Sequence, residues 1–327
     1  MMRAAFYEKN GSAREVLTVG EVETPRPGPG EVRVRLKTSG VNPSDVKARE
    51  GRTRKIAWPR VIPHSDGAGE IDAVGDGVPK SRVGERVWIW NAQWKRAFGT
   101  CAEQVVLPSA MAVKLPAHAS FEAGACLGIP AMTAFHAVEV AGLTKGTTVL
   151  VAGGAGGVGH YAIQFAKARG AEVIATVSSE AKAKVARDAG ADHVIDYKRE
   201  NVAERVMAIT GTKGVDAVIE MDLPANAKHY AAMLHARSVV VVYGTGGFEA
   251  TIPAQFMLTS AIAIKFIFVY ELTQPERTAA VDGINRMLED KSLINNVALK
   301  FPLNDIVAAH EAVEQGKAIG NVVVSLE

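Results

Sequence analysis

The stretch VLVAGGAGGVGHYAIQFAKARGAEVIATVSS, residues 149–179, decides the fold of this chain of 327 residues. An apolar run leads into a glycine loop, a helical pattern follows, and a second apolar run comes after it. Residues 154–159 (GAGGVG) match the pattern G-x-G-x-x-G. The match alone is weak, because the chain contains 31 glycines. Its position between a strand and a helix nevertheless predicts a dinucleotide-binding βαβ unit.

The glycine loop is expected to hold a pyrophosphate. Glycine permits a tight turn, a close approach of the backbone to phosphate, and close packing of the helix on the strand. The free N–H groups at the start of the helix attract the negative charge. The alternative is a turn whose glycines serve packing only. We expect cofactor contacts from Gly154, Gly156, Gly157, Val158 and Gly159.

The end of the second strand indicates which dinucleotide binds. NAD-binding folds usually place an acidic residue there, which accepts hydrogen bonds from the ribose hydroxyls. Val177 occupies this position. The residues that follow favour a 2′-phosphate, and therefore NADPH, because their side chains are donors: Ser178, Ser179 and Lys182. The alternative for the lysine is an ordinary exposed helix position. After the third strand, Tyr197 is a further candidate, as are Lys198 and Arg199.

Composition excludes several classes of protein. The 37 basic and 35 acidic residues nearly cancel, so no global charge favours nucleic acid or a membrane surface. The two cysteines, Cys101 and Cys126, are far apart, which argues against a disulfide scaffold. No apolar run reaches the ~20 residues of a membrane helix, and the N-terminus shows no signal-peptide core and is predicted to be a strand. We expect a soluble, cytoplasmic protein.

The chain divides into a β-rich part and an alternating part. Residues 31–38 alternate as a half-buried strand does, and short strands are expected at 67–75, 85–90 and 101–108. From about residue 120 a helix is expected, broken at Pro130. Apolar strands then alternate with helices, which predicts a parallel sheet covered on both faces. Residues 261–270 (AIAIKFIFVY) are expected to form a buried strand at the sheet edge. A helix (QPERTAAVDGINRMLEDK) and a last strand (NVVVSLE) close the chain.

Several segments together resemble the zinc-free quinone oxidoreductase branch, which includes ζ-crystallin, of the medium-chain dehydrogenase/reductase superfamily. They are SGVNPSDVKAREG (39–51), PHSDGAGEIDAVGDGV (63–78), GERVW (84–88), LGIPAMTAFHAV (127–138), the glycine loop, IEM (219–221) and the C-terminal IGNVVVSL. The resemblance implies an α/β protein with a GroES-like, β-rich catalytic domain, residues 1–124 and 270–327. A Rossmann domain with a doubly wound parallel sheet, residues 125–269, is inserted, and the active site is expected in the interdomain cleft.

The resemblance also predicts that no metal takes part. Zinc-dependent members carry a cysteine ligand near residue 40, a histidine ligand shortly after residue 60, and a lobe with four cysteines. This chain has Val41 and Asn42 in the first region and Ser65 at the histidine position. A catalytic zinc needs about three protein ligands. His64 has no cysteine partner, so we expect it in a loop or the cleft.

Three residues are the expected catalytic ones. Asn42, in the segment NPSD, is expected to donate to a substrate or nicotinamide oxygen, and Asp45 to orient its neighbours. The alternative is that N-P-x-D only forms a turn. Thr133 is expected to face the nicotinamide by resemblance. Lys47 stands where related reductases often carry tyrosine. Residues 88–98 (WIWNAQWKRAF) supply three tryptophans that either stack on a planar acceptor or pack a loop.

The expected function is reduction of quinones or other enones with NADPH. Without a metal, conjugation in the acceptor itself must carry the developing charge, so a few donors suffice. Two alternatives remain: a reductase of enoyl thioesters or other alkenes, and a cofactor-binding structural or RNA-binding protein. An apolar sheet edge invites subunit pairing, so we expect a homodimer or homotetramer. Further cofactor contacts are expected at Tyr243, Gly244, Phe268 and Asn321.

Overall fold

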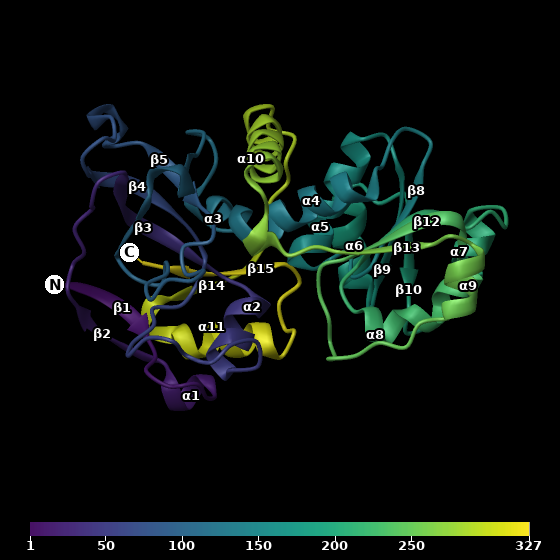
Figure 1. Cartoon of the computed structure of the whole chain (residues 1–327), viewed down its shortest axis with the longest axis horizontal. Helices are drawn as coiled ribbons and strands as arrows, with labels where there is room; N and C mark the ends of the chain where they lie inside the picture. The colour runs from purple at the N-terminus through teal and green to yellow at the C-terminus, as the bar shows by residue number, and fades with distance from the viewer. Residues whose placement is uncertain (327) are drawn as a thin grey trace. The chain divides into compact units, whose positions relative to one another are not determined.

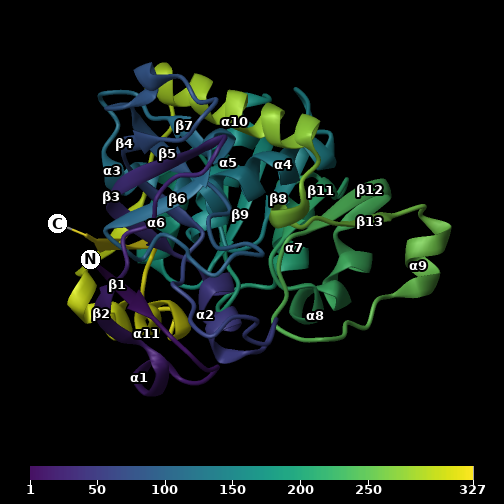
Figure 2. The ribbon, with the colours of Figure 1, turned by 60° about the vertical axis from the view of Figure 1, so that its left-hand side comes forward.

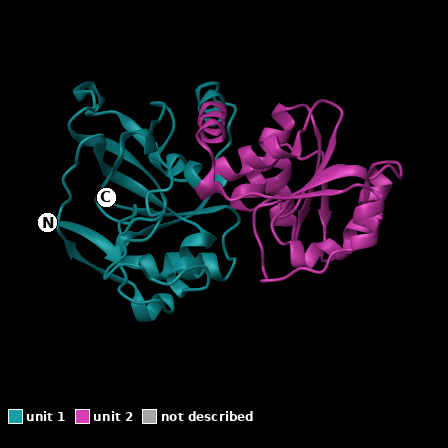
Figure 3. Cartoon of the chain, viewed as in Figure 1, with its two compact units in different colours: residues 1–130, 284–327 teal, residues 131–283 magenta. Residues whose placement is uncertain are grey.

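The computed structural model describes residues 1–326, which form two compact units. The first unit contains residues 1–130 and the C-terminal residues from 284 onward, and the second contains residues 131–283 (Figure 3). The boundary at 283/284 falls inside helix α10, Gln274–Glu289. The expected domain limits, 124/125 and 269/270, lie somewhat earlier on the chain. They stay a prediction, because a compact unit is defined by its contacts and a domain by independent folding.

The first unit is built mainly from antiparallel strands (Figure 1). Its larger sheet has the order β14-β15-β3-β4-β5-β7, and β6 also pairs with β3. The strands are β3 (Glu31–Val41), β4 (Asp66–Val74), β5 (Arg86–Ile89), β6 (Gln104–Pro108), β7 (Ala112–Lys114), β14 (Val297–Pro302) and β15 (Asn321–Ser325). A separate antiparallel pair joins β1 (Met2–Phe6) to β2 (Thr18–Val22). Along β3, Val32, Val34 and Leu36 face the core, as the alternating sequence predicts.

Short helices connect these strands. They are α1 (Ala13–Val16), α2 (Pro43–Glu50), α3 (Phe121–Gly124), α11 (Ile306–Glu314) and the 3-10 turns Lys80–Arg82, Ser109–Met111 and Leu303–Asp305. Strand β14 and helix α11 were not expected from the sequence. β14 pairs in parallel with β15, and α11 connects the two strands. The residues of β14 are only partly buried, so their sequence lacks the strong apolar pattern of the other strands.

The second unit contains a parallel sheet of six strands in the order β10-β9-β8-β11-β12-β13. The strands are β8 (Thr148–Val151), β9 (Glu172–Val177), β10 (His193–Asp196), β11 (Val215–Glu220), β12 (Leu234–Val242) and β13 (Ala263–Phe266). The chain starts in the middle, moves to one edge, and then returns to build the other half. This order is that of a doubly wound dinucleotide-binding fold. The predicted fold class is confirmed.

Helices cover both faces of this sheet. They are α4 (Met132–Ala141), α5 (Gly157–Ala168), α6 (Glu180–Asp188), α7 (Val202–Ile209), α8 (Leu223–Asn226), α9 (Ala254–Thr259) and the 3-10 segments Ala227–Ala232 and Val269–Glu271. Alternate strand residues, such as Leu150 and Ile174, pack with Val206 of α7 and Tyr230 in one apolar cluster. The intervening Val149 and Val151 are also fully buried. Both faces are therefore apolar, as parallel strands require.

Two expectations about local structure were wrong. Pro130 does not break the helix, because it lies inside a π-helical turn, Leu127–Ala131, that runs directly into α4. The interruption falls earlier, between Gly124 and Leu127. The strand β13 is not buried, since Phe266 is 73% exposed and Phe268, just beyond it, 53%. It lies at the sheet edge, beside β12 (Figure 2), as expected. An edge strand has only one neighbour to cover it.

No helix within residues 1–326 combines the length and apolar composition that crossing a bilayer requires.

Candidate functional site

The glycine loop leads from β8 into α5, and three of its glycines are required, one by its backbone conformation and two by close packing. Gly153 has a φ of +69°, a backbone conformation that favours glycine. A Cβ on Gly154 would lie 2.7 Å from the Cβ of Ala175 on β9. A Cβ on Gly159 would lie 2.3 Å from the carbonyl oxygen of Gly153. The tight turn therefore falls on Gly153, one residue before the motif, and not on a motif glycine.

Gly156 differs from its neighbours. A Cβ there would contact only the Gly153 oxygen, at 3.3 Å, so the space beyond it is open. Gly156 also caps the N-terminus of α5. The first backbone bond of this helix runs from His160 N–H to the Gly156 carbonyl, at 2.9 Å. The N–H groups of the preceding turn, at Gly157 and Val158, are thus the unpaired donors that every helix start presents. This geometry suits a phosphate.

The ends of β9 and β10 lie side by side. Val177 ends β9 with its side chain buried, and its carbonyl accepts the N–H of Tyr197 at 3.0 Å. Ser179 caps α6 by accepting the N–H of Lys182. The Lys182 ammonium donates to Ser178 Oγ at 3.1 Å. A hydroxyl, an ammonium and the half-exposed Tyr197 therefore gather where the sequence placed a 2′-phosphate.

The remaining predicted cofactor residues lie in different places. Tyr243 and Gly244 follow β12, and a Cβ on Gly244 would lie 2.8 Å from the Met221 carbonyl, which follows β11. Phe268 comes two residues after β13. These positions share the carboxyl edge of the sheet, where such folds bind ligands. Asn321 belongs to the first unit and donates to the Asn296 carbonyl at 3.2 Å. Their contacts with a cofactor stay a prediction.

Three further predicted residues belong to the second unit: Thr133, Lys198 and Arg199. Thr133 is the second residue of α4 and is buried. Arg199 lies beside an acidic residue, with its Nε 3.7 Å from Asp196 Oδ2. A carboxylate so close lowers the value of Arg199 as a phosphate ligand. Its neighbour Lys198 is exposed. Of the three candidates after β10, Tyr197 is therefore the best placed.

In the first unit, the NPSD segment starts helix α2. Asn42 is the N-cap, Pro43 is the first helical residue, and the Asn42 N–H donates to Asp45 Oδ2 at 2.8 Å. This reciprocal arrangement is a capping box. N-P-x-D therefore starts a helix and does not form an isolated turn, while the expected roles of Asn42 and Asp45 stay predictions. Both side chains are nevertheless buried, so their polar atoms must find partners inside the protein.

Asn42 and Asp66 form a buried hydrogen bond. The Asn42 Nδ2 donates to Asp66 Oδ2 at 2.8 Å. Burial raises the pKa of Asp66 well above its usual range, and the bond from Asn42 opposes this. A Cβ on Gly128 would lie 2.3 Å from Asp66 Oδ1, so glycine is needed here to make room. Sequence reasoning missed Asp66, although it begins the DGAG part of a matched segment.

Asp45 titrates near neutrality. Burial raises its pKa to about 7, while the Asn42 N–H and the guanidinium of Arg54 oppose this rise. A carboxyl with such a pKa changes charge close to neutral pH. Its bond to Asn42 agrees with the expected orienting role, which stays a prediction.

His64 lies in the loop just before β4, as the sequence suggested, but its side chain is inside the protein. It is fully buried with a φ of +78°, and its Nδ1 lies 2.8 Å from Ser39 Oγ. Its Nε2 lies 2.9 Å from Nε2 of His310 on α11, a residue that sequence reasoning missed. Burial lowers the pKa of His64 to about 3. Within residues 1–326, no three His, Cys, Asp or Glu side chains are grouped to hold a metal ion.

The tryptophan-rich segment divides between core and surface. Trp88 is fully buried and donates from Nε1 to Asn285 Oδ1 at 3.1 Å, and Trp90 is also buried. Trp94 is half-buried, with Arg54 and Lys95 both near its ring. Lys47 is half-buried on α2. Packing thus accounts for two of the tryptophans and leaves Trp94 as a candidate for ligand contact.

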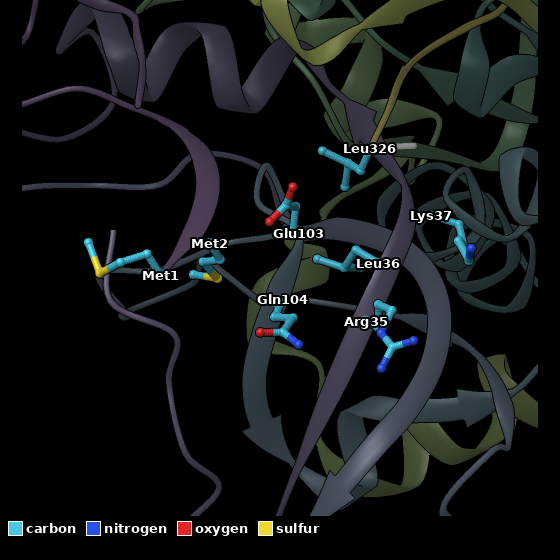
Figure 4. A pocket seen from close by; sticks show the side chains of 8 residues that line it. All are labelled: Met1, Met2, Arg35, Leu36, Lys37, Glu103, Gln104 and Leu326. Atoms are coloured by element: carbon cyan, nitrogen blue, oxygen red, sulfur yellow. The ribbon is translucent and has the colours of Figure 1, made fainter. Parts of the chain in front are cut away.

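A cavity of about 470 Å³ lies elsewhere in the first unit (Figure 4). It is lined by Met1, Met2, residues 35–37 of β3, residues 103–104 and Leu326. None of the predicted site residues borders it. We therefore assign it no part in the reaction.

Family models match both parts of the chain. Residues 28–117 match the alcohol dehydrogenase GroES-like domain, and residues 157–286 match the zinc-binding dehydrogenase family. The quinone oxidoreductase of Rattus norvegicus is 31% identical over 315 residues, which are 95% of this chain and 93% of that protein. The similarity therefore extends over both units.

Solved structures agree with this similarity. A mycobacterial protein in complex with NADPH is 28% identical with a TM-score of 0.87, and covers 99% of this chain and 100% of its own. An NAD-dependent alcohol dehydrogenase is 31% identical with a TM-score of 0.91, and covers 99% of each chain. Relatives of similar fold thus differ in cofactor. The chain belongs to the quinone oxidoreductase branch of the medium-chain dehydrogenase/reductase superfamily, a family of oxidoreductase enzymes.

Proposed function

We propose that this enzyme uses NADPH, without a metal, to reduce quinones or other activated α,β-unsaturated carbonyl compounds by hydride transfer. Family membership supports the reductase chemistry. The observation that carries the choice of acceptor is the buried bond from Asn42 Nδ2 to Asp66 Oδ2. This bond fixes the amide of Asn42 as a hydrogen-bond donor in the region where zinc-dependent relatives carry metal ligands.

The residues of the second unit fit NADPH. Gly156 and the start of α5 offer open backbone donors for the pyrophosphate. Val177 offers no carboxylate to the adenosine ribose, whereas Ser178 and Lys182 offer donors to a 2′-phosphate. This end of β9 favours NADPH over NADH, in contrast to the NAD-dependent relative. When bound, NADPH supplies the hydride from its nicotinamide.

An activated acceptor suits a site without a Lewis acid. Conjugation in an enone or a quinone moves the developing negative charge onto oxygen, where a placed donor stabilises it. Asn42 Nδ2 has two hydrogens, and one is used by Asp66. We assign the second to the acceptor oxygen. Asp45 accepts the backbone N–H of Asn42 and Asp66 accepts its amide, so both carboxyl groups position this donor.

Steady-state kinetics with a panel of quinones and enones test the proposal. The Asn42→Ser variant keeps a residue that caps helices but lacks the amide. Its kcat/KM is expected to fall by about 100-fold or more, the usual loss for a donor to a developing oxyanion. Its dissociation constant for NADPH should not change. Tight NADPH binding without oxidation by any acceptor of the panel would refute the proposed function.

We also propose assembly through the second unit. The edge strand β13 exposes Phe266 and Phe268, and an exposed apolar edge invites pairing with a second copy. A homodimer or homotetramer would cover these rings. Cys101 and Cys126 are both free and buried, which supports action in a reducing compartment such as the cytoplasm.

A further inference from the structure

Four residues of the first unit form a group that we name the Arg54 cluster: Arg54, Gln93, Trp94 and Lys95. Arg54 lies in the connection between α2 and β4, and the other three follow β5. The Arg54 Nη2 donates to Gln93 Oε1. The Arg54 Cζ lies 5.3 Å from the centre of the Trp94 ring, and Lys95 Nζ lies 5.5 Å from the same ring. Two cations therefore meet at one aromatic side chain.

Arg54 differs from the arginines beside it in the chain. Arg52 pairs with Glu50 at 2.7 Å, and Arg60 pairs with Glu8 at 2.7 Å. Among the contacts of residues 1–326, Arg54 has an amide and a ring as partners and no carboxylate within ion-pair distance. It is only half-exposed. A guanidinium has five N–H donors, so its hydrogen-bonding capacity is largely left for another acceptor.

The position of this guanidinium is fixed by neutral groups. Gln93 is 3% exposed, and its Nε2 donates to the Arg96 carbonyl at 2.8 Å. That bond directs the amide oxygen toward Arg54. A charge held by a buried amide and an aromatic ring is preorganised for an anion, because binding loses little further side-chain freedom.

The Arg54 cluster lies near the residues assigned to the reaction. The charge of Arg54 lowers the pKa of the buried Asp45 carboxyl, against the larger effect of burial. It also lowers the pKa of the Tyr7 phenol, which burial raises. Asp45 in turn is bonded to Asn42 at 2.8 Å. The Arg54 guanidinium is therefore within electrostatic range of the Asp45 carboxyl at the start of α2, where we assigned the acceptor oxygen.

We propose that the Arg54 cluster binds an anionic substituent of the electron acceptor, so that the preferred acceptors are enones or quinones that carry a carboxylate. The proposal rests on the proposed function. Hydride adds to the alkene carbon β to the ketone, and the π electrons move to the carbonyl oxygen. A proton from water then adds at the α-carbon, and NADPH leaves as NADP⁺. The carboxylate is unchanged, since it only binds Arg54 through charge-assisted hydrogen bonds.

The test compares trans-3-benzoylacrylate with its methyl ester, which has the same enone and no charge. For the acid, Arg54→Gln is expected to lower kcat/KM about 10- to 100-fold, mostly through KM, as loss of one charge-assisted hydrogen bond does. For the ester, the change should stay within about twofold. Arg52→Gln is the matched control and should leave both acceptors within about twofold, because Arg52 pairs with Glu50.

Calorimetric titration separates this proposal from the proposed function. The saturated product, 3-benzoylpropanoate, is titrated into protein with NADP⁺, and its methyl ester is titrated in parallel. Weaker binding of the acid alone in Arg54→Gln supports the anion site, even if neither acceptor is turned over and the proposed function fails. Equal loss for acid and ester, or a wild-type preference for the ester, overturns the anion site while the reductase function stands.

Discussion

The imidazole rings of His64 and His310 stack inside the first unit, with their centroids 5.1 Å apart and their Nε2 atoms 2.9 Å apart. Ser39 Oγ lies 2.8 Å from the other nitrogen of His64. At a bond between two Nε2 atoms, one ring must donate and the other accept, so the pair is held neutral in complementary tautomers. Burial lowers the pKa of His64 to about 3, and burial together with the charges of His64 and Arg49 lowers the pKa of His310 well below its usual range.

Acid should therefore destabilise the protein through this pair. Below about pH 6.5, each histidine binds a proton in the unfolded chain but not in the folded protein. The contribution of each histidine to the free energy of unfolding is therefore full above about pH 6.5 and decreases as the pH drops below that value. His310→Gln, whose amide can still bond to His64, should reduce the slope of unfolding free energy between pH 6 and 5 by about 1.4 kcal/mol per pH unit.

Denaturant unfolding at several pH values measures this slope. Asp45 changes the free energy of unfolding with pH in the opposite direction. The slope of one protein alone therefore does not isolate the histidine pair, whereas the difference in slope between the variant and the wild type does. His193→Gln makes the same substitution at a partly exposed position in the second unit. Identical slopes for His310→Gln and the wild type would contradict the assignment of a neutral pair.

Asp45 offers a second prediction with the opposite sign. Its folded pKa of about 7 lies above the unfolded value, so its contribution to stability is full below about pH 4 and is lost as pH rises through 7. Asp45→Asn stays neutral and can still accept from Asn42. Between pH 4 and pH 8, the free energy of unfolding of the variant should therefore rise relative to that of the wild type by on the order of 3 kcal/mol. Unfolding curves of both proteins at pH 4, 6 and 8 check this, and a constant difference would count against a buried carboxyl that titrates near 7.

Cofactor choice should depend on Lys182. Its ammonium lies beside Ser178, and one charge-assisted bond to a 2′-phosphate contributes ~1.5–3 kcal/mol. Lys182→Ala should weaken NADPH binding about 10- to 100-fold and leave NADH binding nearly unchanged. The matched control is Lys184→Ala, because that side chain is 74% exposed and pairs with Asp188. Fluorescence titration with both cofactors decides, and equal weakening of NADPH and NADH would show the phosphate assignment to be wrong.

Activity should not depend on a metal. Within residues 1–326, no three His, Cys, Asp or Glu side chains are grouped to hold a metal ion, and burial raises the pKa of both the Cys101 and the Cys126 thiol. Extensive treatment with EDTA and 1,10-phenanthroline is expected to leave kcat/KM unchanged. Elemental analysis of the purified protein provides the control. Stoichiometric zinc whose removal abolishes turnover is the contrary outcome.

The edge strand β13 should determine the oligomeric state. Phe266 is 73% exposed, and a charged residue at a sheet edge opposes pairing. Phe266→Lys is expected to shift the mass measured by light scattering from a dimer or tetramer toward a monomer. Phe248→Lys, at a residue that is 97% exposed in the loop before α9, is the control and should leave the mass unchanged. A monomeric wild type at micromolar concentration would rule out this assembly.

Local patterns were sufficient for much of the architecture. The six parallel strands and the glycine loop follow from residues close in sequence, because strand patterns and turns depend on near neighbours. β14 and α11 were missed because local patterns alone do not specify them. Their residues are arranged by packing against β15 and β3, and a weak local pattern does not show that packing.

The sequence by itself determined the two kinds of structure and the place of the glycine loop, and it predicted Ser178 and Lys182 as phosphate donors, since each of these features lies within one short segment. Only the tertiary structure brought His64 to His310, which are 246 residues apart, and Arg54 to Gln93, which are 39 apart. It also decided that Asn42 bonds to Asp66. Burial and side-chain pairing depend on which distant strands and helices meet. This packing therefore decides the tautomers of the histidine pair, the raised pKa of Asp45 and the pairing of Arg54 with a neutral amide.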